Sequence, residues 1–182
     1  MIPKLDPNDA KLFYELWIPL LDYVNQMHRV NPRLGHMTTP AGLDTDEVRI
    51  VSDFLWKHPE IIDQYLRAVE MPLEHREIVE SWKRFVLGEF ILERHLKRGS
   101  VFISKDDAQV YSVCGIYSTW EEMLPYAPTP IYLRATLIPF KDKIIYDSIF
   151  ACYPIVFGIS ATNDFKEIYL NAKQNKKIHF SL

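Results

Sequence analysis

The stretch FVLGEFILERHL, residues 85–96, divides the chain into two parts with different spacing of apolar residues. Before this stretch, apolar residues recur every three or four positions, which predicts amphipathic helices. From Phe90 onward, apolar and polar residues alternate within short segments separated by turn residues, as is typical of antiparallel strands. The sequence therefore predicts an α+β fold, helical over residues 1–88 and sheet-forming over residues 89–182.

Four helices are expected in the first part. The first contains Pro19, which removes one backbone N–H and crowds the preceding turn at a cost of about 3 kcal/mol. We therefore expect a kink or a break near Ile18. The second helix is expected to begin after Asp44, an N-cap residue, with Glu47 at the position that completes a capping-box-like pair. Two more helices are expected after Pro59 and Pro72.

The second part carries signals for five or six strands and a last helix. Residues 131–138 and 143–150 are rich in β-branched and aromatic residues and flank the turn Lys141-Asp142. We expect these two segments to pair as antiparallel strands.

The change from helix to strand near Gly88 comes without a flexible linker. We therefore expect residues 1–182 to form one compact domain, in which the helical part packs on a curved, mostly antiparallel sheet. The last helix is expected to cover one face of that sheet. A partly closed barrel is an alternative arrangement of the same strands.

The composition is that of an ordinary globular protein, with 48% hydrophobic and 25% charged residues. The net charge is −3: residues 1–85 hold ten Lys or Arg and fourteen Asp or Glu, a balance of −4, and the rest hold eleven and ten, a balance of +1. Neither part has the basic excess of nucleic-acid-binding proteins, so we do not expect nucleic acid as a partner.

Cysteine, histidine and apolar residues bear on location and cofactors. No CxxC pair, apolar leader or run of 18 apolar residues occurs, so we expect a cytoplasmic protein that does not enter a membrane. The six histidines show no spacing typical of a metal site, and we expect neither a metal nor another cofactor. Cys114 is expected to be a small buried residue rather than a nucleophile.

Glu93, Arg94 and His95 are the densest run of polar residues inside a predicted strand. Strand alternation would place Glu93 and His95 on one face and Arg94 on the other. If that face is a cleft, Glu93 could orient His95 as a general base. The alternative, which we favour, is a solvated sheet face with a cross-strand charge pair.

Arg134 and Asp147 lie within the two most apolar predicted strands. A buried charge is rarely left alone, so we expect the two to form an ion pair that serves the structure. The alternative is one half of an anion-binding or catalytic site, with Tyr132 or Tyr146 beside it.

Three segments of the second part, GSVFIS, TLIPFKDKIIYD and AKQN, resemble a family of uncharacterised bacterial proteins, chiefly from Firmicutes. The resemblance spans roughly residues 80–180 and implies a bacterial, cytoplasmic protein. The family brings no established activity, so no site residues are carried over. This chain departs from the family pattern at Asp142 and Ser148, where glycine is expected, and in a less glycine-rich version of residues 158–160.

No motif for a nucleophile, a metal or a phosphate occurs, so we expect a non-enzymatic interaction or regulatory module. Abundant aromatic residues, 13% of the chain, could supply an exposed patch for another protein; the sequence sets no oligomeric state. One alternative is a small hydrolase or transferase with a site in a sheet cleft, formed by Glu93, His95, Arg134 and Asp147. A second, least favoured because of the near-neutral charge, is an RNA-binding barrel that stacks bases on Tyr111 and Tyr132.

Overall fold

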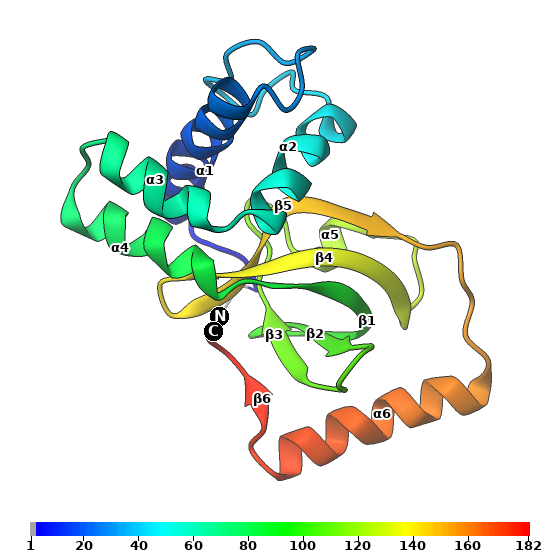
Figure 1. The fold of residues 1–182 in the computed structure, drawn as a ribbon. Helices are drawn as coiled ribbons and strands as arrows, with labels where there is room; N and C mark the ends of the chain where they lie inside the picture. The colour runs from blue at the N-terminus through cyan, green and yellow to red at the C-terminus, as the bar shows by residue number, and fades with distance from the viewer. Residues whose placement is uncertain (1–2) are drawn as a thin grey trace. The chain divides into compact units, whose positions relative to one another are not determined.

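The computed structural model describes residues 3–182, which form two compact units (Figure 1). The helical unit is Pro7–Lys83, and the sheet unit is Arg84–Leu182 together with residues 3–6. The predicted α+β fold is confirmed, with helices in the first unit and a six-stranded sheet and a last helix in the second. That the two units share one core stays a prediction. Across residues 3–182, no helix is both long enough and apolar enough to span a membrane.

Four helices build the helical unit, and their bounds are α1 Pro7–His28, α2 Thr45–Lys57, α3 Glu60–Ala68 and α4 Leu73–Ser81. Of the predicted kink or break near Ile18, the break is wrong, because α1 continues through Pro19, and the kink stays a prediction. Trp17, Leu20 and Leu21 are buried on both sides of this position, and their burial outweighs one missing hydrogen bond. After α4, a short 3₁₀ turn, η1 (Trp82–Arg84), leads to the first strand at residue 86, so the last helix of this part ends earlier than predicted.

Stacked aromatic rings form the centre of the helical unit. The Trp17 ring lies 5.6 Å from Trp56 in a stacked arrangement and 5.6 Å from Trp82 in an edge-on arrangement. Phe13, one turn earlier on α1, adds an edge contact to Trp82 at 6.0 Å. Such pairs contribute beyond the apolar area that they bury, so α1 is anchored to α2 through Trp56 and to the end of the unit's sequence through Trp82.

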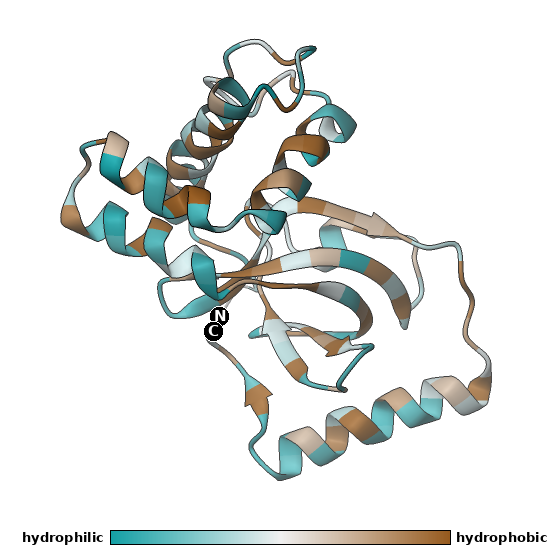
Figure 2. Ribbon diagram, in the orientation of Figure 1, coloured by the Kyte–Doolittle hydropathy of each residue, from teal (hydrophilic) through white to brown (hydrophobic). Residues whose placement is uncertain are grey.

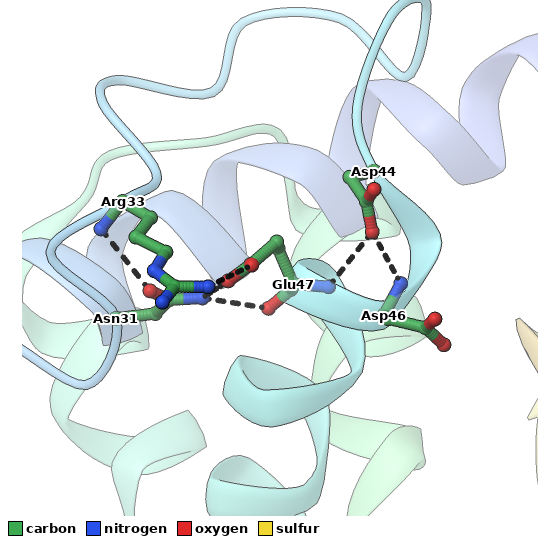
Figure 3. Close-up of polar contacts among 5 residues, drawn as sticks. All are labelled: Asn31, Arg33, Asp44, Asp46 and Glu47. Atoms are coloured by element: carbon green, nitrogen blue, oxygen red, sulfur yellow. Dashed lines mark hydrogen bonds and ion pairs between the residues drawn. The ribbon is translucent and has the colours of Figure 1, made fainter.

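Polar contacts tie the loop before α2 to the start of that helix (Figure 3). Asp44 caps α2 as predicted, because its Oδ1 accepts the backbone N–H groups of Asp46 at 2.9 Å and Glu47 at 3.2 Å. The Glu47 side chain is directed to the loop instead of back to the cap, and accepts hydrogen bonds from Asn31 at 2.6 Å and Arg33 at 3.0 Å. These partners, Asn31 first, lower the pKa of Glu47. The predicted capping-box pair is therefore wrong, and the carboxylate anchors the loop.

The strands of the sheet unit are β1 Val86–Leu96, β2 Gly99–Ser104, β3 Val110–Val113, β4 Ile131–Phe140, β5 Lys143–Cys152 and β6 Ile178–His179. Their order is β2-β1-β4-β5-β3-β6, and an additional pairing of β2 with β3 closes a ring of hydrogen-bonded strands. Neighbours are antiparallel except for the pairs β3–β5 and β3–β6. The predicted hairpin around Lys141-Asp142 is confirmed by the pairing of Phe140 with Lys143.

One face of these strands packs around Trp120, the first residue of the short helix α5 (Trp120–Met123). Its ring lies 4.9 Å from Phe102 on β2 and 4.6 Å from Tyr146 on β5. Thr119 caps α5 and forms a capping box with Glu122, so this buried indole is held by a well-defined turn.

Two strands contain irregularities that change which side chains face which way. The register of β1 against β2 shifts between Leu92 and Arg94, so Glu93 is an extra residue in a β-bulge. The register of β4 against β5 shifts near Thr136, where Ser148 on β5 adopts φ +72°. This left-handed value favours glycine, and a non-glycine residue there is strained.

The helix α6 (Ile159–Gln174) lies across the other face of the sheet, where it contacts β1, β2 and β3 (Figure 1). Polar and apolar residues alternate along it (Figure 2). Tyr169 is the one α6 residue that is fully buried, and it packs with Ile91, Val101 and Ile103 of the sheet. The expectation that the last helix covers a sheet face is confirmed.

Candidate functional site

A pocket of about 380 Å³ lies between the sheet face, the connection after β5 and the first half of α6. We call it the Tyr132 pocket. Apolar side chains supply most of its wall, among them Ile91, Ile103, Tyr132, Phe157, Phe165 and Ile168. Lys105 is the charged residue in its lining. The pocket lies wholly within the sheet unit.

Strand register explains why these side chains meet. Ile91 on β1 is paired with Ile103 on β2 and with Tyr132 on β4, so the three side chains stand in one row on the α6 face. Glu89 lies two residues before Ile91, and Lys105 lies two residues after Ile103. The same alternation therefore places both on this face, beside the row. The polar and apolar parts of the site therefore follow from one register.

Glu89 is the centre of a polar cluster at the edge of the Tyr132 pocket. Its Oε2 accepts hydrogen bonds from Lys105 Nζ at 2.6 Å and from the Tyr132 hydroxyl, while its Oε1 accepts from the Tyr153 hydroxyl at 2.9 Å. The rings of Tyr132 and Tyr153 are 4.7 Å apart, and Lys105 Nζ lies 5.5 Å from the centre of the Tyr132 ring. Four side chains from four segments thus hold one another in place.

The contacts of Glu89 fix the charges of the cluster. Hydrogen bonds from Lys105, and then from Tyr132 and Tyr153, lower the pKa of Glu89 to about 2. The hydrogen bond to Glu89 raises the pKa of Lys105, and it also raises the pKa of the Tyr153 hydroxyl. At neutral pH Glu89 is therefore a carboxylate, Lys105 an ammonium and Tyr153 a protonated phenol.

Aromatic rings continue the wall of the pocket from the sheet to α6. Phe157, in the connection after β5, lies 6.3 Å from Tyr132 and 5.0 Å from Phe165 on α6, with edge-on geometry in both pairs. Rigid side chains of this kind keep a pocket open without a large loss of conformational entropy on binding.

A second pocket of about 360 Å³ lies along the second half of α6, and we call it the Tyr169 pocket. Its apolar lining is Leu96, Val101, Tyr169, Ile178 and Phe180. Three basic side chains, Lys97, Arg98 and Lys173, and the hydroxyl-bearing Ser112 also line it. Val101 and Tyr169 are buried and form the floor, whereas the three basic residues are exposed and form the rim.

The structure separates the predicted pair of Glu93 and His95. The bulge at Glu93 brings its carboxylate to Arg94, whose Nη2 donates to Glu93 Oε1 at 2.7 Å and whose guanidinium lies 4.4 Å from the Tyr169 ring centre. His95 instead contacts Ser100, with 2.8 Å between Nδ1 and Oγ. The less favoured alternative, in which Glu93 orients His95, is therefore wrong, because one extra residue breaks the alternation on which it depended. The favoured cross-strand charge pair on a solvated face is wrong as well, because Glu93 is 9% exposed and its partner Arg94 lies on the same strand.

His95 lines a different pocket, of about 450 Å³, together with Ser100 and Glu121. Burial lowers the pKa of His95, and the nearby charge of Glu121 opposes this shift only partly. The largely neutral imidazole of His95, hydrogen-bonded to the Ser100 hydroxyl, therefore fits a structural role in a half-buried position.

Arg134 and Asp147 are placed differently from each other. Arg134 is paired across β4 and β1 with Glu89, so it faces the polar cluster of the Tyr132 pocket. Asp147 lies in the irregular part of β5, is 2% exposed, and accepts a hydrogen bond from the backbone N–H of Ile149 at 3.1 Å. Their expected ion pair stays a prediction. None of the four candidate residues lines the Tyr132 pocket, and of the four only Arg134 is paired with Glu89 of the polar cluster.

The surroundings of Cys114 and Tyr111, two other candidates named from the sequence, indicate structural roles for both. Cys114 is buried, which raises the pKa of its thiol, and its Sγ lies 3.4 Å from the carbonyl oxygen of Arg98. The Tyr111 ring is buried and stacked on His179 at 5.1 Å, so it offers no free face on that side for a base. Within residues 3–182, no group of three or more potential His, Cys, Asp or Glu ligands is close enough together to hold a metal ion.

From the sequence, Tyr132 was expected beside Arg134 and, in the RNA-binding alternative, as a stacking residue, whereas Glu89, Lys105 and Tyr153 were not expected at a site. A usable signal was present, because Glu89 lies two residues before Ile91 in a predicted strand. Comparisons of the chain with models of protein families, with curated proteins and with solved structures found no match.

Proposed function

We propose that the sheet unit is a non-catalytic binding module that holds a small, mostly apolar molecule in the Tyr132 pocket. The observation that carries this proposal is a pocket of about 380 Å³ with apolar walls and one ordered polar cluster at its edge. Pockets that bind small molecules are typically about 300–1,000 Å³, mainly apolar, and contain a few fixed polar groups. The Tyr132 pocket has each of these properties.

The charges of the cluster favour binding over catalysis. General acid–base catalysis is most efficient when the pKa of the catalytic group lies near the working pH. The pKa of Glu89 is lowered to about 2, and that of Lys105 is raised above its ordinary value, so neither exchanges a proton readily at neutral pH. An ammonium held by a carboxylate is also a poor nucleophile.

The cluster instead suits the orientation of a ligand. Lys105 has three N–H donors, and the hydrogen bond to Glu89 uses one of them. A carbonyl or hydroxyl oxygen of the ligand can accept another, while its apolar body lies against Ile91 and Ile168. Two free cysteines, one buried and one exposed, are compatible with a reducing bacterial cytoplasm, where we place this module.

The test uses N-phenyl-1-naphthylamine, a neutral apolar dye whose fluorescence rises in an apolar environment. We expect saturable binding to the full chain. Replacement of Ile168 by Trp fills the pocket and should weaken binding about tenfold or more. The matched control is Leu170→Trp on the same helix, because Leu170 is exposed and does not line this pocket.

The result is clear only if both variants keep the far-UV circular dichroism of the parent chain. Equal dye affinity for Ile168→Trp and Leu170→Trp would contradict the proposal, as would binding that does not saturate.

A further inference from the structure

Three basic residues line the Tyr169 pocket, and none of them has an acidic partner among the described residues. Within residues 3–182, Lys97, Arg98 and Lys173 form no salt bridge; Lys173 has one contact of another kind, 6.0 Å above the Tyr169 ring. By contrast, Glu93 balances the guanidinium of Arg94, which lies against the same tyrosine ring. The rim of this pocket therefore carries uncompensated positive charge.

These cations surround an apolar floor. Val101 is 1% exposed and Tyr169 is 3% exposed, and both lie at the base of the pocket. Ile178 and the half-exposed Phe180, which follows β6, add apolar surface at one side. A ligand that fits must therefore present an apolar body and a negative charge to the same opening.

We propose that the Tyr169 pocket binds an amphipathic organic anion: an aromatic or aliphatic body that carries a carboxylate, sulfonate or phosphate group. The body packs on Val101 and Tyr169, and the anionic group lies among Lys97, Arg98 and Lys173. The Arg98 guanidinium offers a planar fork that can bind two oxygens of such a group at once. The lysines add charge without a fixed geometry.

The arrangement fits a small soluble anion better than a nucleic acid. A nucleic acid requires a basic stripe that follows many phosphates, whereas this chain has a net charge of −3 and Lys97, Arg98 and Lys173 surround a single pocket. A pocket with a buried floor also suits a compact ligand more than an extended polymer. The proposal is independent of the ligand of the Tyr132 pocket.

The test compares two dyes that share one aromatic body. The anion 8-anilinonaphthalene-1-sulfonate carries the sulfonate that N-phenyl-1-naphthylamine lacks. Titrations are made in the Ile168→Trp background, so that the Tyr132 pocket is filled. We expect the anionic dye to bind saturably, and the triple variant Lys97→Gln/Arg98→Gln/Lys173→Gln to weaken its binding about tenfold. Added salt should weaken the anionic dye and leave any binding of the neutral dye unchanged.

The matched control is Lys166→Gln/Lys176→Gln/Lys177→Gln. It removes the same number of positive charges from or just after α6, at positions outside the lining of the Tyr169 pocket. We expect this control to bind the anionic dye within about twofold of its parent. Equal weakening by the two triple variants would overturn the proposal, since overall charge would then explain the binding. No weakening by either would overturn it as well.

Vesicles distinguish a soluble anion from a lipid surface. We expect the chain to bind neither vesicles of phosphatidylglycerol nor vesicles of phosphatidylcholine. Binding to the anionic vesicles that depends on Lys97, Arg98 and Lys173, without saturable dye binding, would identify a membrane surface and overturn the proposal.

Discussion

The two pockets beside α6 are similar in size and in the elements that form them, but they differ in charge. They measure about 380 and 360 Å³, share one sheet face, and use the two halves of a single helix as a wall. In the Tyr132 pocket, Glu89 balances the charge of Lys105. In the Tyr169 pocket, Lys97, Arg98 and Lys173 line the opening with no salt bridge among the described residues. The comparison shows that the apolar walls determine the size of the ligand that fits. The pairing of charges at the rim determines whether a neutral or an anionic ligand is favoured.

The largest expected effect comes from the residue that holds the shared wall. Tyr169→Ala removes the one fully buried side chain of α6 and should lower the free energy of unfolding of the sheet unit by about 3 kcal/mol. Both dyes should then lose affinity, because α6 forms a wall of each pocket. Urea unfolding and dye titration measure the two effects.

Tyr169→Phe is the control for this experiment, since it keeps the ring that Arg94 covers. It should bind both dyes like the parent chain. If Tyr169→Ala abolished binding of the anionic dye alone, the Tyr132 pocket would not depend on α6, and the shared-wall comparison would fail.

The second-largest effect is expected from a change that gives the Tyr132 pocket the preference for anions proposed for the Tyr169 pocket. Glu89→Gln leaves Lys105 without its carboxylate, so the Tyr132 pocket should gain affinity for the anionic dye by about tenfold. The gain is measured in the Lys97→Gln/Arg98→Gln/Lys173→Gln background, with the Tyr132 pocket unfilled. Glu167→Gln, an equal change of charge at an exposed position of α6, is the control and should show no gain.

A smaller effect should appear in the pH dependence of stability. The pKa of Glu89 is about 2 in the folded chain against an ordinary value of 4.5. A group with a lowered pKa stabilises the folded state fully above its ordinary pKa and loses that contribution as the pH falls toward its folded pKa. The stability difference between the parent chain and Glu89→Gln should therefore be constant above pH 4.5 and vanish toward about pH 2. A difference that stays constant throughout this range would show that the carboxylate charge does not stabilise the fold.

The smallest effect should leave both pockets untouched. Ser148 adopts φ +72°, so Ser148→Gly should relieve backbone strain and, after the entropy cost of glycine, stabilise the chain by about 0.5 kcal/mol. Thermal unfolding measures the gain, and Ser148→Ala, which keeps the strain, is the control. Unchanged affinity for both dyes would separate stability from binding; a loss of stability in Ser148→Gly would mean that the serine side chain outweighs the strain.

Sequence signals from neighbouring residues were enough to predict most of the helices and strands. The turn Lys141-Asp142 and its flanking β-branched residues identified the hairpin correctly, because hairpins depend on residues that are close in sequence. The break at Pro19 was predicted wrongly, because tertiary burial of neighbouring side chains decides the outcome there.

The candidate site was harder to predict, because register and bulges are not visible in one sequence. Glu89 meets Lys105 across 16 residues and Tyr153 across 64, and strand pairing alone brings them together. The bulge at Glu93 has no marker such as glycine, yet it rotates the following residues by one position. An alternation rule applied across it therefore assigned His95 to the wrong face.

Because α6 forms a wall of both pockets, we expect ligand binding at the two pockets to be coupled. The chain runs through α6 between β5 and β6, and one buried side chain, Tyr169, fixes its middle. A ligand bound at one half of α6 would hold the helix against the sheet. A second ligand at the other half would then lose less conformational entropy when it binds. By reciprocity, each ligand must then raise the affinity of the other by the same factor.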